Sequence, residues 1–267
     1  MPNNITPVQI LSLGLWGDIK TAKTTLALTA PKPLFHADLD LGLDRAISRF
    51  ANDHVTQIDH PLSTLLESRT LHDNEIVSRP YLIPMLWPGQ SMQGMLTMLN
   101  TVVTDVAAAY ACPNIKSVII DTGTVLWTLA TNAHLERVQQ TNSQRQRLQQ
   151  IEYARPNSEL RTLYSAARTY RKNLIITHHM GGIYKERLTD HGVESVRIGD
   201  TWAGFSGMGA IMDIVVRTAI SRNDAIPVPM IKIETCGYAL ALEEQELTNP
   251  TFDMLLGIIN NLRNMEV

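Results

Sequence analysis

The residues best suited to chemistry lie near the start of the chain, in the segment Gly17-Asp18-Ile19-Lys20-Thr21-Ala22-Lys23-Thr24. The segment fits the pattern G-x-x-x-x-G-K-[ST], except that Ala22 stands in place of the second glycine. In such a loop, backbone amides and the start of the following helix converge on phosphate groups. Lys23 would supply positive charge to the β- and γ-phosphates, and the Thr24 hydroxyl would ligate Mg²⁺. An incidental turn is the alternative interpretation.

The alanine at position 22 bears on this site. If the position requires a positive φ, Ala22 strains the loop by roughly 1 kcal/mol, because only glycine adopts that conformation freely. Lys20 adds a second cation to the loop and could partly compensate.

Carboxylates and histidines stand where apolar runs end. Asp121 closes the run Ser117-Val118-Ile119-Ile120 and has the form of a strand-end metal carboxylate. Asp38 and Asp40 follow a second run. One of them could polarise an attacking water, or the pair could cap the next helix. His178-His179 follows a third run, where it could contact a γ-phosphate or be a surface pair.

These groups must be positioned by alternating strands and helices. Apolar runs predict strands, and apolar residues at helical spacing predict helices. The predicted strands cover 10–15, 34–37, 118–121, 174–177, 211–219 and 228–233. The predicted helices begin at Lys23, at Leu43, at Met92, at Asn157 or Ser158, and at Leu255. This alternation predicts an α/β fold with a mostly parallel central sheet flanked by helices.

Composition limits the class of protein. The chain has 267 residues, a net charge of −3 and 44% hydrophobic residues, which suits one large domain. We therefore expect a single domain over 1–267, with an irregular insertion or an elaborated sheet edge at about 52–90 and a C-terminal hairpin and helix at about 211–267. Cys112 and Cys236 lack metal-ligand spacing. No signal peptide or membrane span is evident, so we expect a soluble cytoplasmic protein.

Taken in order, these landmarks resemble the phage-encoded RecA-core P-loop ATPases, the AAA-type phage ATPase family that includes Sak-type annealing and recombination proteins. The most specific parts are Thr21-Ala22-Lys23-Thr24-Thr25-Leu26-Ala27-Leu28 and Ile119-Ile120-Asp121-Thr122. The resemblance runs from about residue 8 to 235. It implies a RecA-like P-loop core that binds ATP and Mg²⁺, single-stranded DNA as a partner and a homo-oligomer, either filament or ring. A single-strand-binding protein is a further candidate partner, and the location would be the host cytoplasm.

The resemblance also implies roles for individual residues. Lys23, Asp40, Asp121 and His179 would be catalytic, with Asp40 activating water and His179 sensing the γ-phosphate. Thr24 and Asp121 would hold the metal. The nucleotide-binding set would be Gly17, Asp18, Ile19, Lys20, Thr21, Ala22, Lys23, Thr24 and Thr25. The region 181–207 would match a mobile DNA-binding loop.

The chain departs from the family at one position near the C-terminal hairpin. The resemblance implies a cationic side chain there that would contact the nucleotide bound to the next subunit. The family tends to carry Lys-x-Arg there, whereas this chain has Lys232-Ile233-Glu234 or Glu234-Thr235-Cys236. Lys232 is therefore the one candidate finger, and Glu234 makes efficient hydrolysis an open question.

A local basic segment offers a place for DNA. Residues 131–173 carry eight basic against three acidic side chains, a local charge of +5, with tyrosines interleaved. A solvated helix face is the alternative. The candidate DNA contacts are Arg145, Arg147, Arg155, Lys185 and Arg187.

Three functions therefore remain open. The first is an ATP-dependent protein of phage recombination or annealing that binds single-stranded DNA. The second is a helicase or helicase-loader motor, and the third is a DNA-binding scaffold that binds nucleotide with little turnover.

Overall fold

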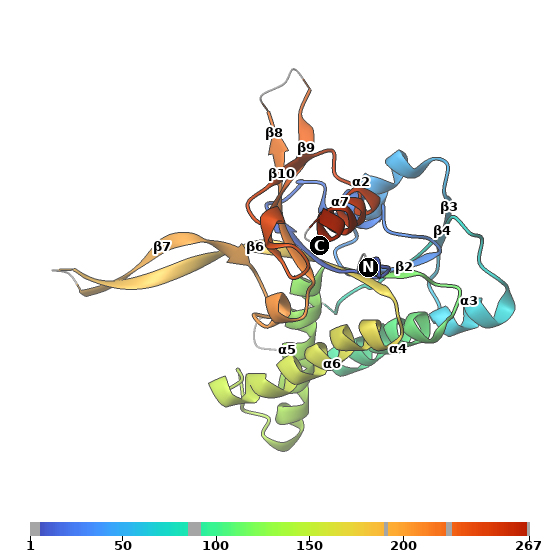
Figure 1. Ribbon diagram of the computed structural model, residues 1–267. Coiled ribbons are helices and arrows are strands. Elements are labelled where there is room, and N and C mark those ends of the chain that lie inside the picture. Colours follow the sequence, from blue (N-terminus) through green and yellow to red (C-terminus); the bar gives the residue numbers. More distant parts are fainter. Residues whose placement is uncertain (1–5, 85–91, 190–191, 223–225, 266–267) are drawn as a thin grey trace.

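A ten-stranded sheet forms the centre of the molecule (Figure 1). The computed structural model describes residues 6–84, 92–189, 192–222 and 226–265. The strands lie in the order β10-β9-β8-β1-β6-β5-β2-β4-β3, and β7 pairs with the outer part of β6. The strands are β1 Ser12–Gly17, β2 Leu34–Asp38, β3 His54–Gln57, β4 Glu75–Pro80, β5 Ser117–Asp121, β6 Asn173–Thr189, β7 Gly192–Trp202, β8 Ile214–Ser221, β9 Val228–Cys236 and β10 Glu246–Thr248.

The predicted α/β class with a mostly parallel sheet is confirmed. Every pairing from β8 across to β3 is parallel, and only β9, β10 and the β6–β7 arm add antiparallel pairings. Strands buried on both faces need apolar residues at nearly every position. In β5, Val118 and Ile120 belong to one core and Ile119 to the other.

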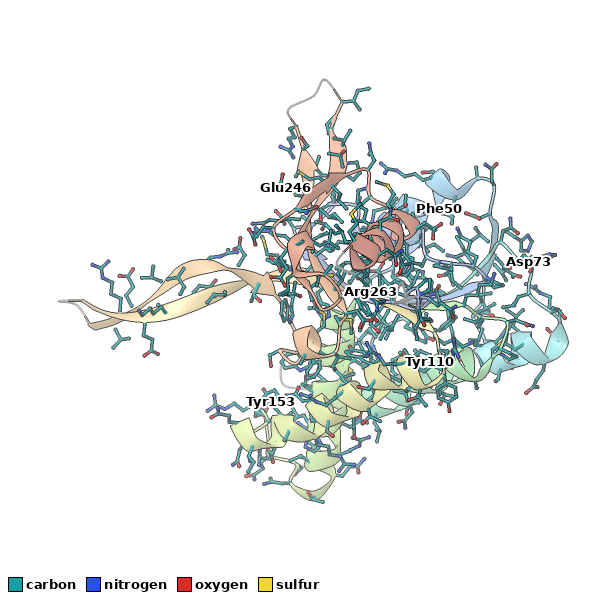
Figure 2. The ribbon with its side chains drawn as sticks, in the orientation of Figure 1. Phe50, Asp73, Tyr110, Tyr153, Glu246 and Arg263 are labelled. Carbon is teal, nitrogen blue, oxygen red and sulfur yellow. The ribbon has the colours of Figure 1, made fainter. Side chains whose placement is uncertain are left out.

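Helices cover both faces of this sheet (Figures 1 and 2). Side chains of α3 to α6 form one core, and those of α1, α2 and α7 form the other. The helices are α1 Lys23–Ala27, α2 Leu43–Ile47, α3 Leu62–Ser68, α4 Met95–Ala111, α5 Gly123–Thr141, α6 Ala154–Thr169 and α7 Phe252–Met265. Short 3₁₀ helices are Ser48–Phe50, Gln150–Tyr153, Met208–Ala210 and Leu240–Leu242. Among the described residues, no helix is both long enough and apolar enough to cross a bilayer.

The described part of 52–90, residues 52–84, is an elaborated edge of the sheet and not an irregular insertion. This segment contains β3, α3 and β4, which extend the parallel sheet at one edge. Leu65 of α3 is buried, whereas Leu82, after β4, is 72% exposed. Two prolines of this segment stand at the ends of elements, where they are tolerated: Pro61 precedes α3 and Pro80 closes β4.

Helix α6 begins three residues before the earlier of its two predicted caps. Ala154 is its first residue, so Pro156 lies in the first turn, where a missing amide donor has no cost. The predicted cap Asn157 instead accepts a hydrogen bond from Trp127 Nε1 at 3.0 Å and ties α6 to α5.

The segment 181–207, predicted to be a loop, is mostly a β-hairpin. Strand β6 continues past the sheet and pairs with β7 to form an arm, residues 181–202, that projects from the body (Figure 1). Figure 2 shows side chains standing away from both sides of this arm. Ile183, Tyr184, Val193 and Ile198 are between 42% and 65% exposed. With no buried face, the arm lacks the apolar alternation that reveals a strand in sequence.

A buried ion pair secures the β3–β4 edge. The Glu75 side chain is fully buried and accepts hydrogen bonds from Arg69 at 2.5 and 2.9 Å, Thr56 Oγ1 at 2.7 Å and the His72 backbone at 2.8 Å. Burial alone would raise the pKa of Glu75, but these hydrogen bonds, led by those from Arg69, lower it from 4.5 to about 2. The ionised form is therefore the one that the fold stabilises.

Glu75→Gln should lower the free energy of unfolding at pH 7 by about 2–4 kcal/mol, because Arg69 loses its buried partner. The folded-state pKa lies below the unfolded one, so this contribution is present above pH 4.5 and is lost as the pH falls toward about 2. Urea unfolding of both proteins across this range measures the difference. A difference that persists at the lowest pH would contradict the interpretation.

Candidate functional site

The loop between β1 and α1 has the backbone of a tight phosphate-binding turn. Gly17 has φ +154°, and a Cβ there would lie 2.4 Å from the Thr218 carbonyl oxygen, so only glycine fits. Lys20 and Ala22 have φ values of 59° and 63°, in the left-handed region. Position 22 thus needs the positive φ for which the motif uses glycine, and Ala22 adopts it at a cost.

Lys23 lies buried beneath this loop. Its Nζ donates to the carbonyl oxygens of Gly17 at 3.1 Å and Asp18 at 2.6 Å. Burial lowers the pKa of Lys23, while the nearby Asp121, Asp18 and Asp40 oppose that shift. The ammonium group is held inside the loop, where it can meet an anionic ligand.

Asp121 is the centre of the site. Thr24 Oγ1 donates to Asp121 Oδ2 at 2.6 Å, and Thr177 Oγ1 donates to Oδ1. His36 Nε2 lies 3.5 Å from Oδ2, with its Nδ1 2.9 Å from Ser78 Oγ. Burial would raise the pKa of Asp121, but His36 and the two threonine hydroxyls hold it below its usual value. The carboxylate is therefore ionised at pH 7.

Sheet register brings these groups together. Asp38 pairs with Asp121 across β2 and β5, and Ile120 pairs with Ile176, which places Thr177 next to Asp121. Parallel strands present their carboxyl ends at one edge of the sheet, where ligands bind in open α/β folds.

The structure separates the two aspartates that the sequence left as alternatives. Asp38 is 2% exposed and accepts from the backbone amides of Gly42 at 2.9 Å and Leu43 at 3.2 Å, so it caps the start of α2. Asp40 faces the cavity described below, where His179 Nε2 lies 3.4 Å from its Oδ2. Of the two, Asp40 is the one placed to meet a water.

The two histidines also point to different places. His179 lines the same cavity as Lys23 and Asp40. Burial lowers the pKa of His178 to about 4, so its ring is neutral at pH 7, and its Nδ1 lies 3.0 Å from the Ala203 carbonyl oxygen. His179 and Ala203 are also joined through their backbones at 2.8 Å. His178 therefore secures the base of the arm.

One cavity of about 620 Å³ joins the predicted residues. Loop residues 19–25, Asp40, Asp121 and His179 all line it, so the structure brings together most of the predicted set. Gly17 and Asp18 lie behind this surface and bind Lys23 through their carbonyl groups.

Among the cavity residues that the sequence analysis missed are two arginines, Arg45 and Arg49. They lie one helical turn apart, after Asp40, at the start of the segment that follows β2. The sequence signal that could have revealed them is their i, i+4 spacing, which places both arginines on one helix face after the strand-end carboxylate Asp40. Thr122 also lines the cavity, and His36 and Thr177 support Asp121 from below.

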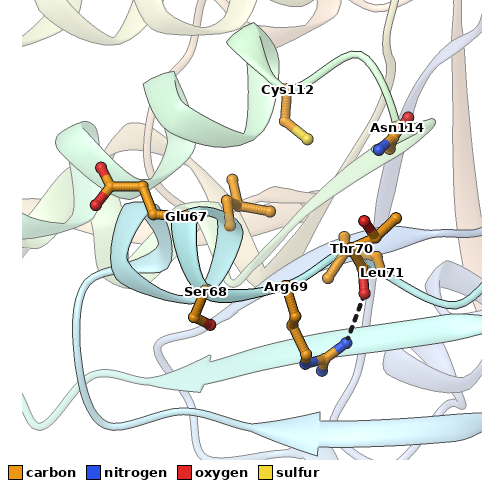
Figure 3. A pocket seen from close by; sticks show the side chains of 8 residues that line it. Glu67, Ser68, Arg69, Thr70, Leu71, Cys112 and Asn114 are labelled. Atoms are coloured by element: carbon orange, nitrogen blue, oxygen red, sulfur yellow. Dashed lines mark hydrogen bonds between the residues drawn. The ribbon is translucent and has the colours of Figure 1, made fainter.

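Two further cavities lie elsewhere. One, of about 200 Å³, shares loop residues 21–22 and Arg49 with the main cavity and extends to Phe50, Ile231 and Pro250. The other, of about 260 Å³, lies between 66–71 and the end of α4 (Figure 3). There Arg69 Nη1 donates to the Thr70 carbonyl oxygen at 3.1 Å, and no predicted site residue is present.

The predicted DNA contacts divide into two groups. Arg145 and Arg155 are paired with Glu152 at 2.5 Å and Glu159 at 3.2 Å, which reduces their availability, whereas Arg147 is exposed. Lys185 and Arg187 are exposed on the arm. Figure 1 shows the arm and the end of α5 as separate projections from the body.

The candidate finger Lys232 lies away from the main cavity of its own chain. It sits on β9 and pairs with Glu244. Glu234, at a β-bulge on the same strand, accepts a hydrogen bond from Trp16 Nε1 at 2.6 Å. Burial raises the pKa of Glu234, with that hydrogen bond opposing the shift. Glu234 thus has a structural partner in β1.

The comparisons with known proteins find similarity at the level of structure only. No protein-family model matches the chain, and none of the curated proteins matches it in sequence. Among solved structures, it is similar to a KaiC-like protein from the hyperthermophilic archaeon Pyrococcus horikoshii OT3, at 10% identity and a TM-score of 0.45. That match covers 89% of this chain and 84% of the other. A likeness this distant assigns no activity, so the site rests on its own geometry.

Ala22→Gly should raise the free energy of unfolding by about 1 kcal/mol, because it removes the left-handed strain of an alanine. The expected increase in Tm is about 2–4 °C for a chain of this size. Ala51 has φ −60° and is exposed, so Ala51→Gly is the matched control and should lower stability by roughly 0.5–1 kcal/mol. Equal losses in both variants would show that the loop is not strained.

Proposed function

We propose that this chain binds and hydrolyses a nucleoside triphosphate, with ATP as substrate and Mg²⁺ as cofactor. The observation that carries the proposal is the 2.6 Å hydrogen bond from Thr24 to Asp121, formed beside the buried Lys23. A hydroxyl and an ionised carboxylate are hard oxygen donors of the kind that Mg²⁺ prefers. Their position at the end of a phosphate loop suits a metal that bridges two phosphates.

Each residue of the site would have its own role. Lys23 would turn from the loop carbonyls to the β- and γ-phosphates, and Thr24 and Asp121 would hold Mg²⁺, which supplies neutralising charge. Asp40, paired with His179, would orient a water and accept its proton as the water oxygen bonds to the γ-phosphorus. The bond from the γ-phosphorus to its bridging oxygen then breaks, and ADP leaves with that oxygen. His179 would release its contact with Asp40 to bind the γ-phosphate.

The smaller cavity that adjoins the loop would take the nucleoside. Phe50, Ile231 and Pro250 offer an apolar lining, and Arg49 stands between this cavity and the main one. Binding pockets combine such apolar walls with a few polar groups that set orientation.

Single-stranded DNA is the partner that we propose for the arm. Lys185 and Arg187 could contact phosphates, and the 60% exposed Tyr184 could stack on a base. Strand β6 runs without a break from His179 into the arm, and Thr124 Oγ1 joins the His179 amide at 3.0 Å to the Ala203 carbonyl at 2.8 Å. Nucleotide bound at the cavity and DNA bound on the arm would thus both contact strand β6.

A RecA-type assembly would complete this proposal. The core resembles RecA-type ATPases in its loop, its strand-end aspartate and its parallel sheet, and we propose a homo-oligomer with Lys232 turned toward the neighbouring chain. The left-handed Ala22 favours a second candidate, a scaffold that binds nucleotide with little turnover.

Lys23→Ala should abolish phosphate release and weaken Mg²⁺–ATP binding by at least about 10-fold, because no other loop cation occupies its buried position. Lys116, exposed outside the cavity, supplies the matched control Lys116→Ala, which should behave as wild type. Phosphate release with and without single-stranded DNA is the measurement. Binding without turnover would favour the scaffold, and unwinding of a forked duplex would indicate a helicase. No binding by wild type would refute the proposal.

Lys185→Ala combined with Arg187→Ala should weaken single-stranded DNA binding and lower the slope of log affinity against log salt by about 1.4, the loss expected for two phosphate contacts. Glu186 lies between them, so Glu186→Gln is the control and should bind as well as wild type or better. Fluorescence anisotropy of a labelled oligonucleotide measures both. An unchanged salt slope would exclude the arm as the DNA site.

A further inference from the structure

The residue before α2 leaves room for about one methyl group beside the proposed metal ligands. A Cβ at Gly42 would lie 3.5 Å from Thr24 Oγ1, 3.6 Å from Asp121 Oδ2 and 3.5 Å from Arg45 Nη2. Gly42 has φ −92° and ψ −13°, a conformation open to any residue. The backbone therefore does not require glycine here, and what glycine provides is the space.

Arg45 projects toward this space without a partner that would hold it elsewhere. It is exposed and lines the main cavity, and among the described residues it forms no ion pair within 4 Å. Arg49 lines the same cavity one turn later and is likewise unpaired there. A guanidinium group offers several donors in a plane and matches the oxygens of a phosphate.

The charges of the cavity support an anionic ligand at this place. Four cations line it, namely Lys20, Lys23, Arg45 and Arg49, against the two carboxylates Asp40 and Asp121. The excess of two positive charges balances a magnesium-bound triphosphate, which carries about two negative charges. Lys23 lies on the side of the cavity that the loop between β1 and α1 forms, and Arg45 lies on the side that α2 forms.

We propose that Arg45 is a catalytic residue that binds the terminal phosphate from within the same chain. The inference rests on the proposed nucleotide site and extends it. Charge develops on the phosphoryl oxygens during transfer, and a guanidinium beside the metal ligands stabilises it. Arg45 would act within its own chain, whereas Lys232, which is paired with Glu244 away from this cavity, is the candidate for the neighbouring chain's site.

The test compares Arg45→Ala and Arg45→Lys with wild type for binding of AMP-PNP and of ADP, each with Mg²⁺, by titration calorimetry. A contact with the terminal phosphate predicts that Arg45→Ala weakens AMP-PNP about 10-fold or more and ADP less than about 3-fold. Arg45→Lys should regain part of the AMP-PNP affinity but little of the lost turnover, because a point charge cannot replace the planar fork. Arg263, half-buried on α7 and outside the main cavity, supplies the control Arg263→Ala.

The outcomes separate the two proposals. If Lys23→Ala loses both nucleotides while Arg45→Ala binds AMP-PNP and ADP as wild type does, the role of Arg45 is refuted and the nucleotide site stands. Equal weakening of both nucleotides by Arg45→Ala also refutes a terminal-phosphate contact. Failure of wild type to bind either nucleotide refutes both proposals.

Gly42→Ala is an independent test that leaves Arg45 in place. The new methyl group would make ordinary contacts of 3.5–3.6 Å with the side chains around it, so the protein should fold normally. Because the methyl group fills the space between Arg45 and the metal ligands, AMP-PNP binding should weaken about 5-fold or more. Unchanged AMP-PNP affinity in this variant would refute the use of that space by a phosphate.

Discussion

The site depends on keeping one carboxylate ionised inside the sheet. Asp121 is 2% exposed, and a buried charge is costly unless hydrogen bonds and counter-charges satisfy it. Thr24 from α1, Thr177 from β6 and His36 from β2 each contact this carboxylate. The partners come from three segments that are distant in sequence, so Asp121 is satisfied only when β2, β5 and β6 align and α1 packs over them.

The phosphate loop is the second constraint, because its backbone conformation is unfavourable by itself. Lys20 and Ala22 both adopt left-handed values, and such residues persist only where the surroundings hold them. Thr21 Oγ1 lies 2.6 Å from Thr218 Oγ1 on β8, and Gly17 packs against the same residue. Strand β8 thus holds the loop in the shape that encloses Lys23 Nζ.

Strand β6, which lies between β1 and β5, connects Asp121 and the cavity to the arm. Strand β6 supplies Thr177 to Asp121, His179 to the cavity and residues 181–189 to the arm. The continuous strand β6 and the contact between His178 Nδ1 and the Ala203 carbonyl oxygen thus link the cavity to the arm. The neutral, buried ring of His178 makes this contact independent of pH near 7.

Sequence alone determined the parallel core and most of the site. A strand buried on both faces must be apolar throughout, so the strands ending at Asp38, Asp121 and Thr177 are visible locally, as is the loop around Lys23. The edge strand β3 and the arm were missed because exposed strands carry no such run, and the buried β4 was missed because polar residues flank its Ile76-Val77 pair.

Only the tertiary structure decided which residues meet at the cavity. It placed Asp40 at the cavity, and it placed Asp38 where its carboxylate caps the start of α2. It also brought Arg45 to the space that Thr24 and Asp121 border. These outcomes depend on strand register and on the angle at which a helix leaves its strand. Both arise from packing between segments far apart in the chain, which no local pattern of residues records.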